Sequence, residues 1–397
     1  MWFNRDISAA IRTSDHAIQV LRGPRQCGKT SLLLELDPSF VEVSLDDPAL
    51  REVANRDPEL FLRQFGDQKL FIDEAQYAPA LFPSLKRRVD LYKRGAGRQQ
   101  HTIVRLTGSN QILMDRSVKE SLAGRASFFD LNTLSVAEIR AQKDTPIQDI
   151  LFCGGWPEIH GRDLAPGPYL DNYINSYVEK DIVLAAGIQK AREFLRLVQL
   201  LAGRVGQTID YSAMASECGI DGKTVKDWVS ILERMHVVAL VPPYSTNLTS
   251  RLIKSPKLYF IDTGLACRLQ GWSAARPILT SPQQGPLFEC LVFSELWKTN
   301  MNFRLGWRIY HWRSRDKEEV DFLIQRDPND WLFVEAKVSR SPTPDLSTFP
   351  LVRKVFGRPP AVIVCHEEGD RIVDVHVPIS KLRDCLLDPK NMLSPTR

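Results

Sequence analysis

Residues 23–30 have the sequence Gly23-Pro24-Arg25-Gln26-Cys27-Gly28-Lys29-Thr30, a glycine-rich turn that ends in a lysine and a threonine. An apolar run at residues 17–22 precedes this turn, and the helix-like segment Ser31-Leu32-Leu33-Leu34 follows it. The glycines let backbone N–H groups converge on phosphate oxygens, and the N-terminus of the helix adds partial positive charge. Between a strand and a helix, this spacing is specific for phosphate binding. We predict that residues 23–31 bind the phosphates of ATP together with Mg²⁺.

The residues of this loop have distinct expected roles. Lys29 is expected to neutralise charge on the γ-phosphate as a catalytic residue, and Thr30 is expected to offer its hydroxyl to Mg²⁺. The predicted nucleotide-binding set consists of Gly23, Pro24, Arg25, Gln26, Cys27, Gly28, Lys29, Thr30 and Ser31.

A metal ion at Thr30 needs a second protein ligand, because one hydroxyl cannot hold it alone. The segment Leu70-Phe71-Ile72-Asp73-Glu74 supplies this ligand at the end of an apolar strand-like run. We expect Asp73 to join Thr30 in the Mg²⁺ shell and Glu74 to polarise the attacking water. A buried strand that ends in solvated acids would have the same sequence, but the two motifs support each other.

Polar residues also follow the strand-like run at residues 102–106, in Thr107-Gly108-Ser109-Asn110. A side chain at this strand end would lie between the two motifs and sense the γ-phosphate, and Asn110 or Ser109 fits that role. A capping turn would use the same residue types. Arg125 is a candidate for stabilising transition-state charge in cis or across a subunit boundary, and the alternative is a solvated surface arginine.

Around these motifs, apolar strand-like runs alternate with helical patterns through the first third of the chain. The runs at residues 17–22, 41–45, 69–72 and 102–106 each end at polar or glycine residues. This alternation is typical of βαβ units. It predicts an α/β fold with a parallel sheet that places the motifs at one edge.

Several of these segments resemble a large family of bacterial and archaeal ATPases with an AAA-type core and a C-terminal domain of unknown function 4143. The resemblance covers nearly the whole chain, and it implies an AAA-superfamily ATPase. The segments that resemble the core are Gly23 to Thr30, Phe71-Ile72-Asp73-Glu74-Ala75-Gln76, Leu106-Thr107-Gly108-Ser109 and Gly124-Arg125. The segments that resemble the C-terminal region are Gly154-Gly155-Trp156-Pro157-Glu158, Tyr177-Val178-Glu179-Lys180-Asp181 and Phe260-Ile261-Asp262-Thr263-Gly264-Leu265.

Between residues 192 and 241 the apolar spacing predicts three short helices followed by a strand. Three helices and a hairpin are typical of a winged helix-turn-helix, whose third helix meets DNA at its start. Lys223, Thr224 and Lys226 have the exposed positions of such a helix, with Trp228 on its inward face. Because only two lysines are present, a protein-binding winged helix is an equal alternative.

The C-terminal part has acids on two consecutive strand-like segments. Alternation places Glu319 with Asp321, and Glu335 with Lys337, on one face of a sheet. Glu289, on the preceding helix, adds a third possible metal ligand. Two carboxylates that hold Mg²⁺ and a lysine that orients water suit phosphodiester cleavage. The pattern resembles the restriction-endonuclease-like superfamily, in which Glu289, Asp321, Glu335 and Lys337 would form the metal site.

Two other interpretations of these acids stay open. They could lie on the solvent face of an edge strand, or belong to a nuclease-like fold retained for binding without cleavage. The run that begins His311-Trp312-Arg313, just before the acids, supplies cations and a ring that could contact phosphates and stack bases. A solvated hairpin has the same composition.

The predicted order of parts follows from these patterns. It is an AAA-type P-loop ATPase domain at residues 1–150, a helical connector at 151–190, a winged helix at 191–245 and a restriction-endonuclease-like domain at 246–397.

Composition narrows the class of protein further. The chain has 397 residues, a hydrophobic fraction of 43%, and a net charge of +4, which does not by itself indicate a nucleic-acid partner. The absence of a long apolar segment or a signal-like start predicts a cytoplasmic protein without membrane association. DNA and a protein partner both remain open as ligands, and the AAA core makes oligomerisation an option.

Overall fold

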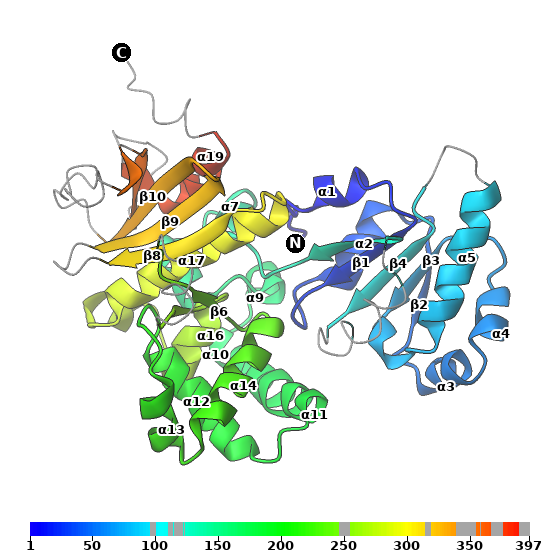
Figure 1. The fold of residues 1–397 in the computed structure, drawn as a ribbon, viewed down its shortest axis with the longest axis horizontal. Helices are drawn as coiled ribbons and strands as arrows, with labels where there is room; N and C mark the ends of the chain where they lie inside the picture. The colour runs from blue at the N-terminus through cyan, green and yellow to red at the C-terminus, as the bar shows by residue number, and fades with distance from the viewer. Residues whose placement is uncertain are drawn as a thin grey trace.

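The structure is a computed structural model, and it describes residues 1–95, 101–109, 114, 122, 124–245, 255–313, 319–338, 355–357, 359–366 and 376–388. Figure 1 shows two lobes, with the N-terminus between them. We call residues 7–131 the first lobe and residues 133–388 the second lobe. The two lobes have separate hydrophobic cores.

The first lobe is a five-stranded parallel sheet with the strand order β2-β3-β4-β1-β5. Its strands are β1 (Ile18–Arg22), β2 (Val41–Ser44), β3 (Leu70–Asp73), β4 (Val104–Gly108) and β5 (Ala126–Asp130). Its helices are α1 (Ser8–Arg12), α2 (Lys29–Leu36), α3 (Pro48–Arg56), α4 (Pro58–Arg63), η1 (Ala75–Tyr77) and α5 (Leu81–Gly95). The α/β fold with a parallel-sheet core, predicted from the sequence, is confirmed.

The strands of this sheet are apolar at consecutive positions because both faces of the sheet are covered. Val20 packs into the core on one face and Leu21 into the core on the other. Ile72 and Phe71 divide in the same way. Because side chains alternate between the two faces of a strand, one short strand contributes residues to both cores.

The second lobe begins with a group of helices that surrounds Trp156. These helices are α7 (Val136–Arg140), α8 (Ile147–Cys153), α9 (Pro157–Arg162), α10 (Pro166–Tyr173), η2 (Ile174–Ile182) and α11 (Val183–Ala186). The η2 segment is a π-helix, a rare form that often occurs at functional sites. The rings of Trp156, Tyr173 and Tyr177 contact one another in sequence in tilted pairs, with centroid distances of 4.3 and 5.1 Å.

Three further helices and a pair of antiparallel strands come next along the chain. They are α12 (Ala191–Gly203), α13 (Tyr211–Cys218), α14 (Gly222–Arg234), β6 (Val238–Val241) and β7 (Lys257–Phe260). Asp210 and Asp221 cap the second and third helices by accepting backbone N–H bonds. Val225, Trp228 and Leu232 lie buried on the inner face of α14.

The last part is a mixed five-stranded sheet with the order β12-β11-β10-β9-β8. Its elements, with the helices before and after it, are α16 (Thr263–Leu269), η3 (Arg276–Thr280), α17 (Gln284–Asn302), β8 (Arg308–Arg313), β9 (Glu319–Asp327), β10 (Asp330–Lys337), β11 (Ala361–Cys365), β12 (His376–Pro378), η5 (Ile379–Lys381) and α19 (Leu382–Leu387). The β8, β9 and β10 strands are antiparallel, and β11 and β12 continue in parallel with β10. The C-terminal sheet-containing domain is thus confirmed.

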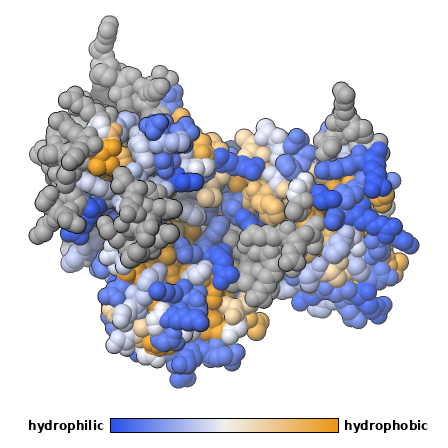
Figure 2. All heavy atoms as spheres, in the orientation of Figure 1, coloured by the Kyte–Doolittle hydropathy of each residue, from blue (hydrophilic) through white to orange (hydrophobic). Residues whose placement is uncertain are grey.

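One large hydrophobic core runs through the second lobe, from Leu134 to Leu386, and a smaller cluster that includes Trp312 and Phe333 lies in its C-terminal sheet. Backbone hydrogen bonds also join its parts, because His311 in β8 donates to Pro242 O and accepts from the N–H of Tyr244. Among the described residues, no helix is long and apolar enough to cross a membrane. Figure 2 shows that hydrophilic side chains cover much of the first lobe on the face in view.

Asp262 holds the chain in place by hydrogen bonds where it passes from the first lobe to the second. Its buried carboxylate accepts from Thr133 Oγ1 at 2.6 Å and from the N–H of Gly155 at 2.9 Å, and it also caps α16. A Cβ atom on Gly154 would lie 1.9 Å from this carboxylate, so only glycine fits there. Gly155 has a different reason, because a Cβ atom there would lie 2.1 Å from Leu134 O.

Candidate active site

The loop between β1 and α2 has a backbone that only particular residues can adopt. Gly23 has φ +155°, and a Cβ atom there would lie 2.0 Å from Leu131 O. Gly28 has φ +93° and is the N-cap of α2, without a side chain to bond the first N–H groups of the helix. These N–H groups at the positive end of the helix suit phosphate oxygens. The local sequence therefore forms the anion cradle expected from it.

Lys29 is the first residue of α2, and its side chain is buried. The ammonium donates to Gly23 O at 3.1 Å and to Pro24 O at 2.9 Å, which holds it over the loop. A buried cation at this place favours a polyanionic ligand.

Thr30 and Asp73 lie together, as the sequence predicts. The Thr30 hydroxyl is 3.1 and 3.0 Å from the two carboxylate oxygens of Asp73, although β3 is far from α2 in the sequence. Thr107 at the end of β4 donates a second hydroxyl hydrogen bond to Asp73. A hydroxyl and a carboxylate are oxygen ligands of the kind that Mg²⁺ prefers, so this pair fits the ion that the sequence implies.

The Asp73 carboxyl has a raised pKa. Burial is the largest cause, and the hydrogen bonds from Thr107 and Thr30 oppose it. The negative charge of the neighbouring Glu74 adds to the upward shift. A bound divalent cation would favour the ionised form of this carboxyl.

Glu74 follows Asp73 in the left-handed conformation, with φ 53°. Its carboxylate accepts from Ser109 N at 3.1 Å and from Ser109 Oγ at 2.8 Å, and Gln76 Nε2 is a further donor. Burial acts to raise the pKa of Glu74, but the charge of Lys29 and these hydrogen bonds outweigh it, and the pKa is lowered. Glu74 therefore stays ionised, as a group that orients or deprotonates water must be.

The sheet order brings these residues together, because β4 lies between β1 and β3. The carboxyl ends of all three strands meet at one edge, where ligands of open α/β sheets bind. Ser109 is therefore placed against Glu74, as a residue that senses the site would be. Asn110, the other candidate for this role, lies outside the described residues.

Arg125 lies at the opposite end of the strands, where they begin. It precedes β5, whose first residue Ala126 pairs with Ile18, the first residue of β1. The guanidinium forms a bidentate ion pair with Asp90 on α5, at 2.7 and 3.1 Å. Because the phosphate loop follows the other end of β1, roughly 13 Å away along the strand, Arg125 cannot act in cis. The option of action across a subunit boundary stays a prediction.

A cavity of about 550 Å³ opens over the phosphate loop. Its lining includes residues 25–31 and Glu74 from the first lobe. The rest of the lining comes from segments that the sequence motifs did not indicate. These are residues 1–3, together with Leu134 and α9 of the second lobe. This volume suits a small-molecule ligand. Sequence reasoning missed these residues because they carry no motif and reach the loop only through the packing of the lobes.

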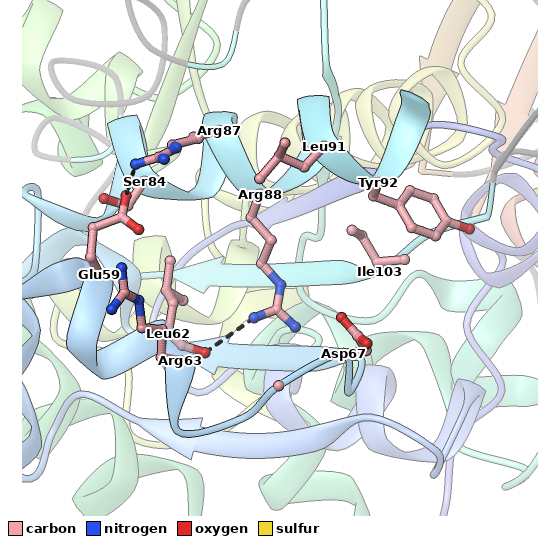
Figure 3. Close-up of a pocket in the computed structure, with 11 residues that line it drawn as sticks. Glu59, Leu62, Arg63, Asp67, Ser84, Arg87, Arg88, Leu91, Tyr92 and Ile103 are labelled. Atoms are coloured by element: carbon pink, nitrogen blue, oxygen red, sulfur yellow. Dashed lines mark hydrogen bonds and ion pairs between the residues drawn. The ribbon is translucent and has the colours of Figure 1, made fainter. Parts of the chain in front are cut away.

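A larger cavity of about 710 Å³ lies elsewhere on the first lobe, and Figure 3 shows its lining. It includes Gly66 and Asp67, before β3, and Ile103, before β4, so it lies at the amino ends of the strands. Arg88 spans it and donates to Leu62 O at 3.2 Å (Figure 3). This cavity is therefore at the edge opposite the phosphate loop.

The π-helical segment η2 connects the site to the second lobe. The buried Tyr177 hydroxyl donates to Ser109 O at 3.2 Å. One turn later, Asp181 forms an ion pair with Arg25 of the phosphate loop at 2.6 Å. The η2 segment therefore contacts the phosphate loop and also Ser109, which donates hydrogen bonds to Glu74.

The C-terminal acids lie close together, but cations of the chain already engage them. Lys337 Nζ is 2.7 Å from Glu335, and the Asp321 carboxylate accepts from the N–H of Ala336 at 3.0 Å. Burial, with the charges of Glu289 and Glu335, raises the pKa of Asp321 well above its ordinary range. Burial also raises the pKa of Glu335, against the opposing effect of Lys337.

Lys257, which the sequence did not single out, is the central cation of this cluster. Its ammonium lies 3.1 Å from Glu289 and 2.9 Å from Glu319, and Tyr259 also donates to Glu289. Burial acts to lower the pKa of Lys257, but the acids outweigh it, and the pKa is raised. Within the part of the chain that the structure describes, no group of three or more His, Cys, Asp or Glu side chains is arranged to hold a metal ion.

The remaining candidates for nucleic-acid contact have mixed positions. Lys223 and Lys226 are exposed on α14, and Lys226 lies 5.4 Å from the ring centroid of Tyr211. His311 and Trp312 are buried in β8, so the expectation that they contact phosphates and bases is wrong. Residues 314–318, the rest of that run, lie outside the described residues.

Comparison with known proteins divides the chain into three. Family models match an AAA domain at residues 15–140, a domain of unknown function (DUF8612) at residues 145–276 and a domain of unknown function (DUF4143) at residues 284–382.

Individual proteins are similar to this chain at low sequence identity. An uncharacterized protein of Mycobacterium tuberculosis is 28% identical over 350 residues, which cover 86% of this chain and 75% of the relative. An uncharacterized protein of Haemophilus influenzae is 23% identical over 250 residues, or 59% of each chain. Among solved structures, a Walker-type ATPase of Pyrococcus abyssi is similar over 68% of this chain and 96% of its own, with 15% identity and a TM-score of 0.41.

Proposed function

Because the chain combines an AAA domain of the P-loop type with a C-terminal DUF4143 domain, we propose that it binds ATP with Mg²⁺ and hydrolyses it. The observation that carries this proposal is the meeting of Lys29, the Thr30–Asp73 pair and an ionised Glu74 at one edge of the sheet. These are the groups that phosphoryl transfer to water requires.

Each group has a part in this reaction. The loop N–H groups and Lys29 bind and orient the phosphates, and Thr30 and Asp73 hold the metal. Bound Mg²⁺ would neutralise charge that develops on the phosphate oxygens. Glu74 orients the attacking water and accepts its proton, and its hydrogen bonds from Ser109 and Gln76 fix the direction of its carboxylate.

The proposed use of hydrolysis is a nucleotide-dependent switch that acts on DNA or a protein partner without cleaving it. Two contacts support coupling to the second lobe, since η2 reaches Ser109 through Tyr177 and the loop through Asp181. The Lys257 ion pairs with Glu289 and Glu319 favour a cluster that holds the second lobe together over a nuclease centre. A metal-dependent nuclease at Asp321 and Glu335 remains the second candidate.

Nucleotide binding tests the proposal at its first step. Calorimetric titration of the full chain with MgATP is expected to give saturable 1:1 binding, weakened at least tenfold in Lys29→Ala, since that change removes the buried cation. Lys86→Ala, which changes an exposed lysine on α5, is the matched control and should bind as the wild type does. Equal affinity in the wild type and Lys29→Ala would count against the loop as the binding site.

Incubation with DNA separates the two candidate uses. The switch predicts that binding to DNA or a captured protein differs between ATP and ADP, while DNA stays intact in Mg²⁺ or Mn²⁺. Cleavage that is lost in Asp321→Ala would instead support the nuclease.

A further inference from the structure

We infer that Trp2 is the stacking platform for the base of the bound nucleoside triphosphate. This inference rests on the proposed nucleotide binding and names the part of the cavity that binds the base. It concerns the part of the cavity that residues 1–3 and α9 line.

The lining of the cavity combines two kinds of residue. The phosphate loop and Glu74 supply charge recognition. Residues 1–3, Leu134 and α9 supply the rest, with the apolar side chains of Trp2, Leu134 and Pro157 beside Glu158 and Arg162, which form an ion pair at 3.5 Å. A nucleoside triphosphate has a charged tail and a flat aromatic head. A ligand held by its phosphates at the loop would place its base against this second part of the lining, where Trp2 offers a partly exposed ring.

Trp2 is positioned for this role by its neighbours. Phe3 is buried in the core of the second lobe and meets His160 edge to face, with ring centroids 6.4 Å apart. A Cβ atom on Gly161 would lie 3.3 Å from Met1 O, so α9 lets the segment lie close against it. Trp2 itself keeps 41% of its surface exposed, although the next residue, Phe3, is buried.

The segment is also tied to the phosphate loop itself. Arg5 donates to Cys27 O at 2.9 Å and to Asn132 O at 2.7 Å, and its guanidinium pairs with Glu138 at 3.3 Å. The distance between the indole and the loop is therefore set by buried contacts. A platform that is held in place before binding loses little entropy when the base stacks on it.

The test compares a ligand that has a base with one that lacks it. Mg-ATP and Mg-tripolyphosphate are titrated into the full-length wild type, Trp2→Ala and Trp2→Phe. Stacking of a base on an aromatic side chain predicts that Trp2→Ala binds MgATP about 5- to 150-fold more weakly. Tripolyphosphate affinity should be unchanged, and Trp2→Phe should recover most of the ATP affinity because it retains a ring.

Leu164→Ala is the matched control, because Leu164 is a comparably exposed apolar side chain just after α9 and does not line the cavity. It should bind both ligands as the wild type does. Unchanged ATP affinity in Trp2→Ala would overturn the inference, as would equal weakening of both ligands, which indicates a disturbed loop. A wild type that binds neither ligand would overturn the proposed function as well.

Discussion

Thr107 joins the two acidic residues of the site. Its hydroxyl donates to Asp73 and accepts from the backbone N–H of Glu74 at 3.3 Å. The hydrogen bond to Asp73 lowers the pKa of that carboxyl, against the upward effect of burial. Thr107 therefore helps to keep Asp73 in the ionised form that can hold a metal ion.

This arrangement predicts the acid limb of the pH dependence. The pKa of Asp73 lies above its ordinary value of 3.8, and the metal-holding form is present above that pKa and lost as the pH falls through it. The pKa of Glu74 is lowered from its ordinary value, with the charge of Lys29 and its hydrogen bonds outweighing burial. In Thr107→Val, loss of the hydrogen bond raises the pKa of Asp73 further, so the acid limb of ATP turnover should move to higher pH.

The pH dependence of kcat/KM for MgATP, which reports the groups of the free enzyme, checks this prediction. Thr102→Val, which changes an exposed hydroxyl just before the same strand, is the control and should leave the profile in place. An unmoved acid limb in Thr107→Val would show that another group sets it.

At the residue scale, the sequence predicted the loop, Asp73 and Glu74 because each belongs to a local motif with a fixed chemistry. The structure brings these residues together as expected. Trp2 and Lys257 were not predicted, because each becomes part of a site only through contacts with distant segments. Arg125 is different, because its local sequence suggested a role at the phosphates but it lies where β5 begins, at the end of the strands opposite the phosphate loop.

At the scale of the elements, β7 connects two parts of the second lobe. It pairs with β6, yet its first residue, Lys257, reaches α17 at Glu289 and β9 at Glu319. The lysine side chain is 9% exposed, so its charge is largely removed from water. Its ion pairs thus join the hairpin to the C-terminal sheet.

Removal of this lysine should be costly. Lys257→Met leaves Glu289 without its buried cation and should lower the free energy of unfolding by about 2–3 kcal/mol, less than a fully buried pair because Glu319 is partly exposed. Denaturant unfolding measures the change. The double variant Lys257→Met, Glu289→Gln removes the unpaired charge as well and should recover part of the loss.

A different outcome would support a metal centre. If Lys257→Met were as stable as the wild type and Mn²⁺ bound to the wild type at Asp321 and Glu335, the acids would be metal ligands. Glu217→Gln, a partly exposed acid paired with Arg204 on the surface, is the control for loss of an ordinary ion pair.

The helices and strands themselves could be predicted well, because apolar periodicity and glycine turns mark them locally. The acids expected on two strands and on the helix before them do lie on β9, β10 and α17. The π-helical form of η2 could not be predicted, since its sequence is amphipathic like that of an α-helix. Burial of His311 and Trp312 was also missed, because it depends on other segments of the chain. Trp312 packs in a cluster that includes Phe333 and Tyr244, and His311 forms a backbone bridge with Pro243.

At the scale of the whole molecule, the nucleotide cavity lies where the two lobes meet. The first lobe supplies the phosphate loop and Glu74, and the second supplies α9 and contacts from η2. Residues 1–6 cross between them, and Asp6 at the end of this segment pairs with Arg383 near the end of the described chain at 3.0 Å. A change at the phosphates can therefore reach the second lobe through short, direct contacts.

The parallel-sheet core and the C-terminal sheet-containing domain could be predicted, but the way they pack could not. Sequence patterns report short-range periodicity, whereas the main core of the second lobe depends on contacts between residues far apart in the chain. The tie between Asp262 and Thr133 spans 129 positions. For this reason the lining of the cavity from the second lobe appeared only in the structure.

The central claim is that the chain hydrolyses ATP with Glu74 as the residue that activates water. Steady-state phosphate release by the full chain in MgATP, compared between the wild type and Glu74→Gln, tests it most directly. Glu74→Gln should bind MgATP with nearly unchanged affinity and release phosphate at least 100-fold more slowly, because the amide cannot accept the proton. Glu35→Gln, an exposed acid on α2, should keep the wild-type rate. Equal rates in the wild type and Glu74→Gln, or no release by the wild type, would contradict the claim.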